Sequence, residues 1–233
     1  MSNTPPISLD LVVRAYTMGA FPMATGRHGQ IRWYSPDPRA ILPLDTARFS
    51  RSLLRRVRSG KFEITFDTAF EDVVRGCAQA RRKHEETWIN EDIIRVYTQL
   101  HQAGVGHSVE AWLRIPLASK KHEVDCKEIT DEVATDRPFV SSAEDKTENR
   151  MLVGGLYGLA LGGAFFGESM FSRVSDASKV CLVHLVEHLS SRGYALLDTQ
   201  IANSHMQQFG IIEIPRSDYL DRLTQALDMF VSW

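Results

Sequence analysis

Residues 154–172, GGLYGLALGGAFFGESMFS, constrain the fold of this chain more than any other segment. Two apolar, glycine-rich runs meet at a Gly-Gly pair, which predicts two antiparallel strands joined by a tight turn. The second run leads into Glu168 and Ser169, so the carboxylate is expected at the rim of an apolar surface. Such a surface suits a site that grips an uncharged side chain and orients one polar group beside it.

A second polar pair ends another apolar strand, LLDTQ at residues 196–200. The two-residue period of a strand places Asp198 and Gln200 on the same face. We therefore take Asp198, Gln200 and Glu168 as candidate site residues. The competing interpretation is structural, because an aspartate at this position could also cap the strand end or the following helix.

The bulk composition is that of an ordinary globular protein. The 233 residues suffice for one large domain or two small ones, with 43% apolar and 24% charged residues. The first ten residues lack the features of a signal peptide, and no stretch is apolar enough for a membrane span. Three widely spaced cysteines, Cys77, Cys126 and Cys181, indicate unpaired thiols in a reducing cytoplasm.

The charge is distributed unevenly along the chain. Residues 1–62 hold ten Lys/Arg and three Asp/Glu, a net +7, and since the whole chain carries −2 the other 171 residues carry −9. A basic helix is expected over residues 47–59, with four arginines on one face as a phosphate-binding surface. An ordinary solvated helix is the alternative. The candidate tRNA-binding residues are Arg48, Arg51, Arg55, Arg56, Arg58 and Lys61.

The remaining pattern predicts a mixed α/β (α+β) fold. Further helices are expected over residues 8–19, 68–80, 90–104, 175–193, 203–210 and 216–227. Strands are expected over residues 62–67, 107–114, 194–200 and 211–215, with two short strands inside 30–44 after a turn-rich loop at 20–29. Residues 115–150 carry a net −3 and little periodicity, which predicts an inserted surface loop; a regulatory role is the alternative.

Several longer motifs then occur in a fixed order: AYTMGAFPM, WYSPDPRAIL, HSVEAW, GGLYG, GESMFSR, ASK, LLDTQ, and FG followed by IPR. Over about residues 9–220 the chain resembles the leucyl/phenylalanyl-tRNA–protein transferases of bacteria. The resemblance implies a small N-terminal α/β domain, residues 1–45, followed by a GNAT-like (acyl-CoA N-acyltransferase type) catalytic domain. That second domain covers residues 46–233 and includes the insertion at about 115–150.

The resemblance also implies an activity. Leu or Phe, and in some members Met, moves from aminoacyl-tRNA to the N-terminal Arg or Lys of an acceptor protein, which marks that protein for N-end-rule degradation. The aminoacyl ester is already activated, so no cofactor, nucleotide or metal is expected. The resemblance also implies that the catalytic residues are Asp198, which deprotonates or orients the incoming amine, Gln200 beside it, and Glu168, which contacts the α-amino group or the sugar of the donor. The implied enzyme is cytoplasmic and monomeric and has no membrane partner.

An apolar pocket for the aminoacyl side chain is implied by the same resemblance. Its candidate residues are Leu156, Ser169, Met170, Phe171, Leu185, Leu189 and Leu197, although each leucine would also suit an ordinary core. Trp112 corresponds to an aromatic residue near the terminal adenosine. Met23 stands where the family usually has the Trp of Phe-Pro-Trp, so ring stacking is lost there.

Two other functions compete with this interpretation. A CoA-dependent N-acyltransferase would need a glycine-rich turn opening a helix, and GESMFSRVSDASK contains none. A non-catalytic RNA-binding adaptor would not need the three candidate catalytic residues. His184 and His188 are spaced one helical turn apart, but no third ligand or HExxH motif accompanies them, so no metal site is predicted.

Overall fold

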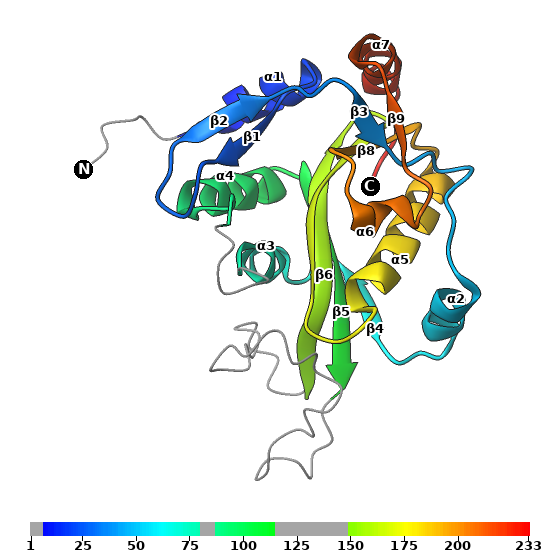
Figure 1. The fold of residues 1–233 in the computed structure, drawn as a ribbon. Helices are drawn as coiled ribbons and strands as arrows, with labels where there is room; N and C mark the ends of the chain where they lie inside the picture. The colour runs from blue at the N-terminus through cyan, green and yellow to red at the C-terminus, as the bar shows by residue number, and fades with distance from the viewer. Residues whose placement is uncertain (1–6, 80–86, 115–148) are drawn as a thin grey trace.

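The computed structural model describes residues 7–79, 87–114 and 149–233, in which helices and strands alternate along the chain (Figure 1). The strands are β1 (Phe21–Ala24), β2 (Ile31–Tyr34), β3 (Arg39–Ile41), β4 (Glu63–Phe66), β5 (Gly106–Arg114), β6 (Arg150–Leu161), β7 (Ala164–Ser172), β8 (Leu196–Gln200) and β9 (Ile212–Ile214). The helices are α1 (Leu9–Thr17), α2 (Arg51–Arg58), α3 (Phe70–Ala78), α4 (Glu91–Gln102), α5 (Ala177–Arg192), α6 (Ser204–Gln207) and α7 (Arg216–Leu227).

Seven of these strands form one mixed sheet in the order β4-β5-β6-β7-β8-β3-β9, and β1 and β2 form a separate antiparallel pair. Among the described strands of the large sheet, β7 and β8 make the one parallel pair. The fold is therefore a mixed α/β arrangement with a small N-terminal sheet and a larger mixed sheet.

Helices cover both faces of the large sheet (Figure 1). One hydrophobic cluster joins α1, α3 and α4 to one face, and a second joins α2, α5 and α6 to the other. The longest helix, α5, packs on β5, β6 and β7. No helix among the described residues is long and apolar enough to cross a membrane.

The glycines of β6 let helices approach the sheet on both sides. A Cβ added at Gly154 would lie 2.5 Å from the Cβ of Ala177 on α5. On the other face, a Cβ at Gly155 would lie 2.9 Å from a methyl group of Val73 on α3. A larger residue at either position would push a helix outward, which explains the glycine-rich composition of this buried strand.

Most predicted elements are confirmed, including the hairpin of β6 and β7 and the order of elements after residue 61. Two predictions are wrong in detail. The stretch 20–29 is not all loop, because Phe21–Ala24 pairs with β2 as a strand. The basic helix begins at Arg51 instead of residue 47, because Ser50 is its N-cap. Most of the predicted insertion, residues 115–148, lies outside the described residues, and its last residue, Arg150, opens β6.

Candidate functional site

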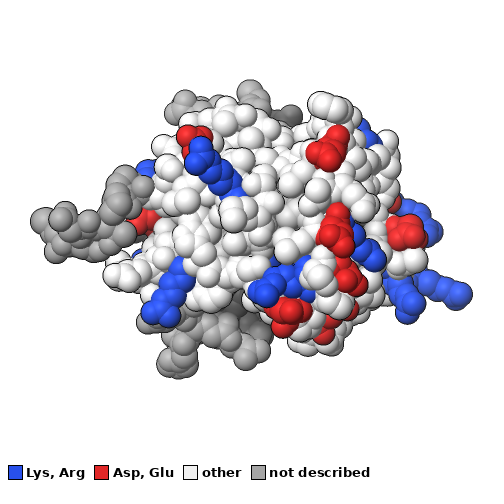
Figure 2. Space-filling model, turned by 90° about the horizontal axis from the view of Figure 1, so that it is seen from above, with Lys and Arg blue, Asp and Glu red and all other residues white. Residues whose placement is uncertain are grey.

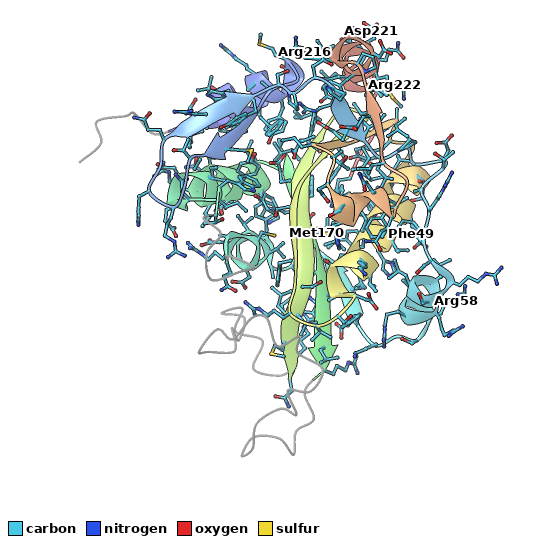
Figure 3. All side chains as sticks on the ribbon, viewed as in Figure 1. Phe49, Arg58, Met170, Arg216, Asp221 and Arg222 are labelled. Atoms are coloured by element: carbon cyan, nitrogen blue, oxygen red, sulfur yellow. The ribbon has the colours of Figure 1, made fainter. Side chains whose placement is uncertain are left out.

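A cavity of about 350 Å³ lies where strands β7 and β8 separate. The two strands pair only over Ala164–Phe166 and Leu196–Asp198, so the backbone beyond these residues is free to diverge. Figure 3 shows Met170 at this place, beside the strands and α6. The predicted site residues that line the cavity are Leu156, Glu168, Ser169, Met170, Leu185 and Leu197.

The lining residues come from both faces of the sheet. We call the apolar half the side formed by Leu156, Met170, Leu182, Leu185, Leu197 and Met206, all packed in the cluster on the α5 face. We call the polar half the side formed by Gln79, Thr87, Tyr157 and Glu168. An apolar space with a few converging polar groups is the usual form of a site for a small ligand group.

Glu168 is set into the polar half by a β-bulge. Gly158 pairs with Gly167 and Tyr157 pairs with Ser169, so Glu168 is the extra residue on its strand. A bulge re-aims a side chain locally, and it turns this carboxylate toward α1 and α4. Gly158 and Gly167 pair beside the bulge, and a glycine inside a strand is a usual sequence signal for one.

Glu168 is 8% exposed, and the hydrogen-bond donors to its carboxylate among the described residues are neutral groups. Tyr16 and Gln200 each donate a hydrogen bond to Oε1 at 2.7 Å, and Tyr97 donates to Oε2 at 3.0 Å. Burial raises the pKa of Glu168 to about 7, although the hydrogen bonds from these residues favour the charged form. The group is therefore poised to exchange a proton near neutral pH.

Asp198 is fully buried and does not line the cavity. Arg39 donates to both carboxylate oxygens, from Nε to Oδ1 at 3.0 Å and from Nη2 to Oδ2 at 2.6 Å. Tyr219 donates to Oδ2 at 2.8 Å. The guanidinium of Arg39 also donates to the carbonyl of Gly19 at 3.0 Å, so this ion pair ties the end of α1 to the large sheet.

Gln200 connects the two carboxylates. Its backbone N–H donates to Oδ1 of Asp198 at 2.8 Å, and its side-chain amide donates to Glu168. Its backbone φ of +64° lies in the left-handed region, where a residue other than glycine is held at a cost of about 1–3 kcal/mol. The bond to Asp198 supports this conformation, which aims the amide at Glu168.

Four residues of this cluster were not among the predicted site residues. They are Tyr16, Arg39, Tyr97 and Tyr219. Tyr16 lies inside the motif AYTMGAFPM and Arg39 inside WYSPDPRAIL, so these motifs could have identified both as site residues. Tyr97 and Tyr219 occupy regular helical positions on α4 and α7, where they read as core residues.

Four predicted pocket residues lie elsewhere. Trp112 is on β5, where its indole N–H donates to Thr65 at 2.8 Å. Phe171 is not among the residues that line the cavity and packs beside Gly76 of α3. Leu189 is buried one helical turn beyond Leu185, and Met23 is half-buried on β1.

A larger groove adjoins the cavity. It has a volume of about 890 Å³ and lies between the β1–β2 hairpin and helices α3 and α4. Its walls include Arg27, Trp33 and Arg75, and it shares Gln79 and Thr87 with the smaller cavity. A chain laid along this groove would therefore reach the polar half of the cavity.

The predicted basic residues surround α2. Arg48, Arg51, Arg55 and Arg58 are exposed, and Figure 3 shows Arg58 pointing away from the sheet. Arg48 precedes the helix, Arg56 lies 4.0 Å from Asp176, and Lys61 lies over the ring of Phe62. On the face in Figure 2, basic and acidic side chains are interspersed, so that face has no field of one sign.

The two helical histidines have other contacts. His184 lies 3.7 Å from Glu187, and the ring of His188 packs against Phe66 and Trp233. Within the described ranges no group of three or more His, Cys, Asp or Glu side chains is arranged to hold a metal ion.

Comparisons with known proteins cover nearly the whole chain. The family described as leucyl/phenylalanyl-tRNA protein transferase matches residues 41–126 and 135–224, and its N-terminal domain matches residues 6–37. A leucyl/phenylalanyl-tRNA–protein transferase of Gloeobacter violaceus is 49% identical over 218 residues, 94% of this chain and 93% of the relative. Those of Paramagnetospirillum magneticum and Chlorobaculum parvum are 46% and 44% identical, over 95% of this chain and 90% and 96% of theirs.

Proposed function

The chain belongs to the leucyl/phenylalanyl-tRNA protein transferase family, and we propose that it transfers Leu or Phe, with Met as a further donor, from aminoacyl-tRNA to a protein. The observation that carries the proposal is the cavity of about 350 Å³, whose apolar half adjoins the buried carboxylate of Glu168. A reaction that moves an uncharged amino acid onto an amine requires both features at once.

The apolar half is the proposed pocket for the donor side chain. Six aliphatic and methionine side chains line it, beside the neutral polar residues Thr199 and Asn203 and the imidazole of His205 in the same cavity. A charged donor side chain would therefore lose most of its hydration there. Such a pocket separates donors mainly by the amount of apolar surface they bury, at about 1–3 kcal/mol per methylene group. Methionines adapt to ligands of different shape, which supports acceptance of both Leu and Phe.

The groove beside the cavity is the proposed path of the tRNA acceptor end. Trp33 is 38% exposed on its wall and offers a ring for base stacking, and Arg27 supplies positive charge. The exposed arginines around α2 are proposed to contact the RNA backbone at a separate place, through phosphates without base readout.

The proposed chemistry is aminolysis of an ester. The acceptor nitrogen forms a bond to the carbonyl carbon, the carbon–oxygen bond to the ribose breaks, and the ribose oxygen takes up the proton that the amine loses. Gln200 and the mutually hydrogen-bonded hydroxyls of Tyr16 and Tyr97 fill at most three of the roughly four acceptor sites of the Glu168 carboxylate, so at least one remains for the incoming amine. Its pKa of about 7 suits transient proton transfer at neutral pH.

Asp198 is a positioning residue in this proposal and does not accept the proton as Glu168 does. Its carboxylate is sealed from the cavity and its charge is matched by Arg39, so it does not meet the amine directly. It holds the backbone of Gln200, and Gln200 in turn holds Glu168. Glu168 is thus the proposed proton acceptor, with Gln200 and Asp198 as positioning residues.

The acceptor and the cellular role complete the proposal. We take the acceptor to be a protein with N-terminal Arg or Lys, the result to be N-end-rule degradation, and the enzyme to be a cytoplasmic monomer that needs no cofactor. The catalytic part is proposed to be GNAT-like and to follow a small domain at residues 1–45. Strand β3, which lies before residue 45, pairs within the large sheet, so this part of the proposed small domain contacts the catalytic part directly.

A CoA-dependent N-acyltransferase fits the residues less well. The helix after β7, α5, has Asp176 at its N-cap position, with a backbone φ of +70°. A pyrophosphate would need backbone N–H groups and no negative charge at this place. A simple RNA-binding adaptor would have no use for a buried carboxylate whose pKa is raised to about 7.

The test is transfer of labelled Leu from Leu-tRNA to a peptide beginning with Arg, beside the same peptide beginning with Ala. We expect label only on the Arg peptide, without CoA, nucleotide or added metal. Glu168→Gln should abolish transfer and keep tRNA binding. No label on either peptide, with tRNA still bound, would favour the adaptor.

A further inference from the structure

Tyr157 on β6 carries a buried hydroxyl that the fold leaves unpaired. The side chain is 0% exposed, and its hydroxyl has no hydrogen-bond partner in the part of the chain that the structure describes. A buried donor without a partner costs about 1–3 kcal/mol, so its retention calls for an explanation. Two equally buried tyrosines nearby, Tyr16 and Tyr97, both donate to Glu168.

The position of Tyr157 supplies that explanation. The strand register pairs it with Ser169, next to Glu168 in the bulge of β7. Its ring meets the ring of Tyr97 edge-on, with centroids 5.6 Å apart. Both Tyr157 and Glu168 line the polar half of the cavity. Tyr157, with its unpaired hydroxyl, and Glu168 are therefore neighbouring residues in the wall of the same cavity.

The chemistry of Tyr157 and Glu168 indicates which part of a substrate would bind in the polar half of the cavity. Burial and the neighbouring charge of Glu168 raise the pKa of Tyr157, so its hydroxyl is neutral and can both donate and accept. A carboxylate beside it attracts groups that carry N–H hydrogens and repels a developing oxyanion. In a bound aminoacyl ester, the α-amino group is attached to the same carbon as the side chain. A side chain in the apolar half therefore brings that amino group to the polar half.

We propose that the hydroxyl of Tyr157 hydrogen-bonds the α-amino group of the donor aminoacyl residue and so orients its ester for attack. This inference rests on the proposed transferase function and adds a substrate-binding residue to it. It assigns the two amines of the reaction to different groups: Glu168 receives the incoming amine, and Tyr157 holds the amine of the donor.

The experiment removes the two interacting groups one at a time. Wild type and Tyr157→Phe are compared with tRNA charged with Phe, and with the same tRNA charged with 3-phenylpropanoic acid, which lacks only the α-amino group. We expect kcat/KM of the variant to fall about tenfold with Phe, the usual value of one hydrogen bond. With the desamino donor, wild type and variant should be equal. An equal loss with both donors, or no loss with Phe, would overturn the proposal.

Thermal unfolding separates this function from a structural role. Tyr157→Phe should leave the unfolding midpoint unchanged or raised, because the hydroxyl that it removes has no hydrogen-bond partner among the described residues. Tyr97→Phe, the matched control, should lower the midpoint because it removes the bond to Glu168. A marked loss of stability in Tyr157→Phe would show that its hydroxyl is paired within the protein, and would contradict the inference.

Binding of the same two charged tRNAs, without acceptor, separates failure of this inference from failure of the proposed function. If wild type binds them and transfers neither, the transferase proposal fails. The contact with the amino group is then still decided by binding: Tyr157→Phe should bind Phe-tRNA about tenfold more weakly and the desamino donor equally well. Equal binding of Phe-tRNA by both proteins would reject it.

Discussion

Glu168 and Asp198 are both buried carboxylates, and they lie on neighbouring strands joined through Gln200. Their partners differ. Asp198 faces the guanidinium of Arg39, whereas Glu168 is bonded to two phenols and an amide. A buried ion pair keeps its carboxylate charged and occupied, whereas neutral partners leave a carboxylate able to take up a proton. The partners, more than the depth of burial, separate a structural carboxylate from one suited to proton transfer.

The Asp198 cluster also connects distant parts of the chain. Arg39 on β3 reaches the end of α1 through Gly19 and contacts the ring of Tyr219 on α7. The Glu168 cluster instead opens on the cavity. Changes in the first cluster should therefore alter stability most, and changes in the second should alter proton chemistry most.

The largest effect is expected from Arg39→Met. Removing the guanidinium breaks a fully buried ion pair and leaves Asp198 without its counter-charge, which should lower the free energy of unfolding by about 3–5 kcal/mol. Urea unfolding at pH 7 measures this. Arg75→Met is the matched control, because its ion pairs with Glu71 and Glu91 are exposed and should contribute less than about 1 kcal/mol. The double variant Arg39→Met, Asp198→Leu should recover part of the lost stability, because it removes both members of the pair. Similar losses of stability for Arg39→Met and Arg75→Met would contradict a structural role for the buried ion pair.

Glu168 should make the protein less stable as the pH rises. Its pKa rises from an ordinary value of 4.5 to about 7 on folding, so between these values the native state binds a proton that the unfolded state has lost. The stabilisation is complete below about pH 4.5 and is lost as the pH approaches 7, amounting to about 3 kcal/mol. Glu168→Gln keeps the shape and cannot titrate, so its stability should change less between pH 5 and 8. Parallel pH curves for the two proteins would contradict the assignment.

Two tyrosine variants sharpen the contrast between the clusters. Tyr97→Phe and Tyr219→Phe each remove one hydroxyl that donates to a buried carboxylate, so each should lose about 1–3 kcal/mol of stability. Tyr97→Phe should also raise the pKa of Glu168, because that hydroxyl favours the charged form. The pH profile of aminoacyl transfer should therefore shift upward for Tyr97→Phe and stay in place for Tyr219→Phe. A shift of the same size in both would mean that Asp198 also governs the proton transfer.

How far the sequence predicts this site depends on the distance between partners. Glu168, Asp198 and Gln200 were recognisable because polar residues at the ends of apolar strands are a local signal. Arg39 pairs with a residue 159 positions away, and no local pattern shows that contact. The same limit explains why Trp112 and Phe171 were predicted as pocket residues although neither lines the cavity, since the face on which each side chain lies depends on strand register. Helix α2 was expected to begin at residue 47, whereas the cap at Ser50 sets its start at Arg51.

The smallest effect on stability is expected outside both clusters, on α2. Arg55 is exposed, so Arg55→Ala should change the free energy of unfolding by less than about 0.5 kcal/mol. If this face holds a tRNA phosphate, the slope of log K for tRNA binding against log salt should fall by about 1. Arg222→Ala is the control, because Arg222 lies on α7, far from α2 in Figure 3, and should leave the slope unchanged. Equal slopes for both variants would remove α2 from the tRNA-binding surface, while the comparison of the two carboxylates would stand, since neither depends on this helix.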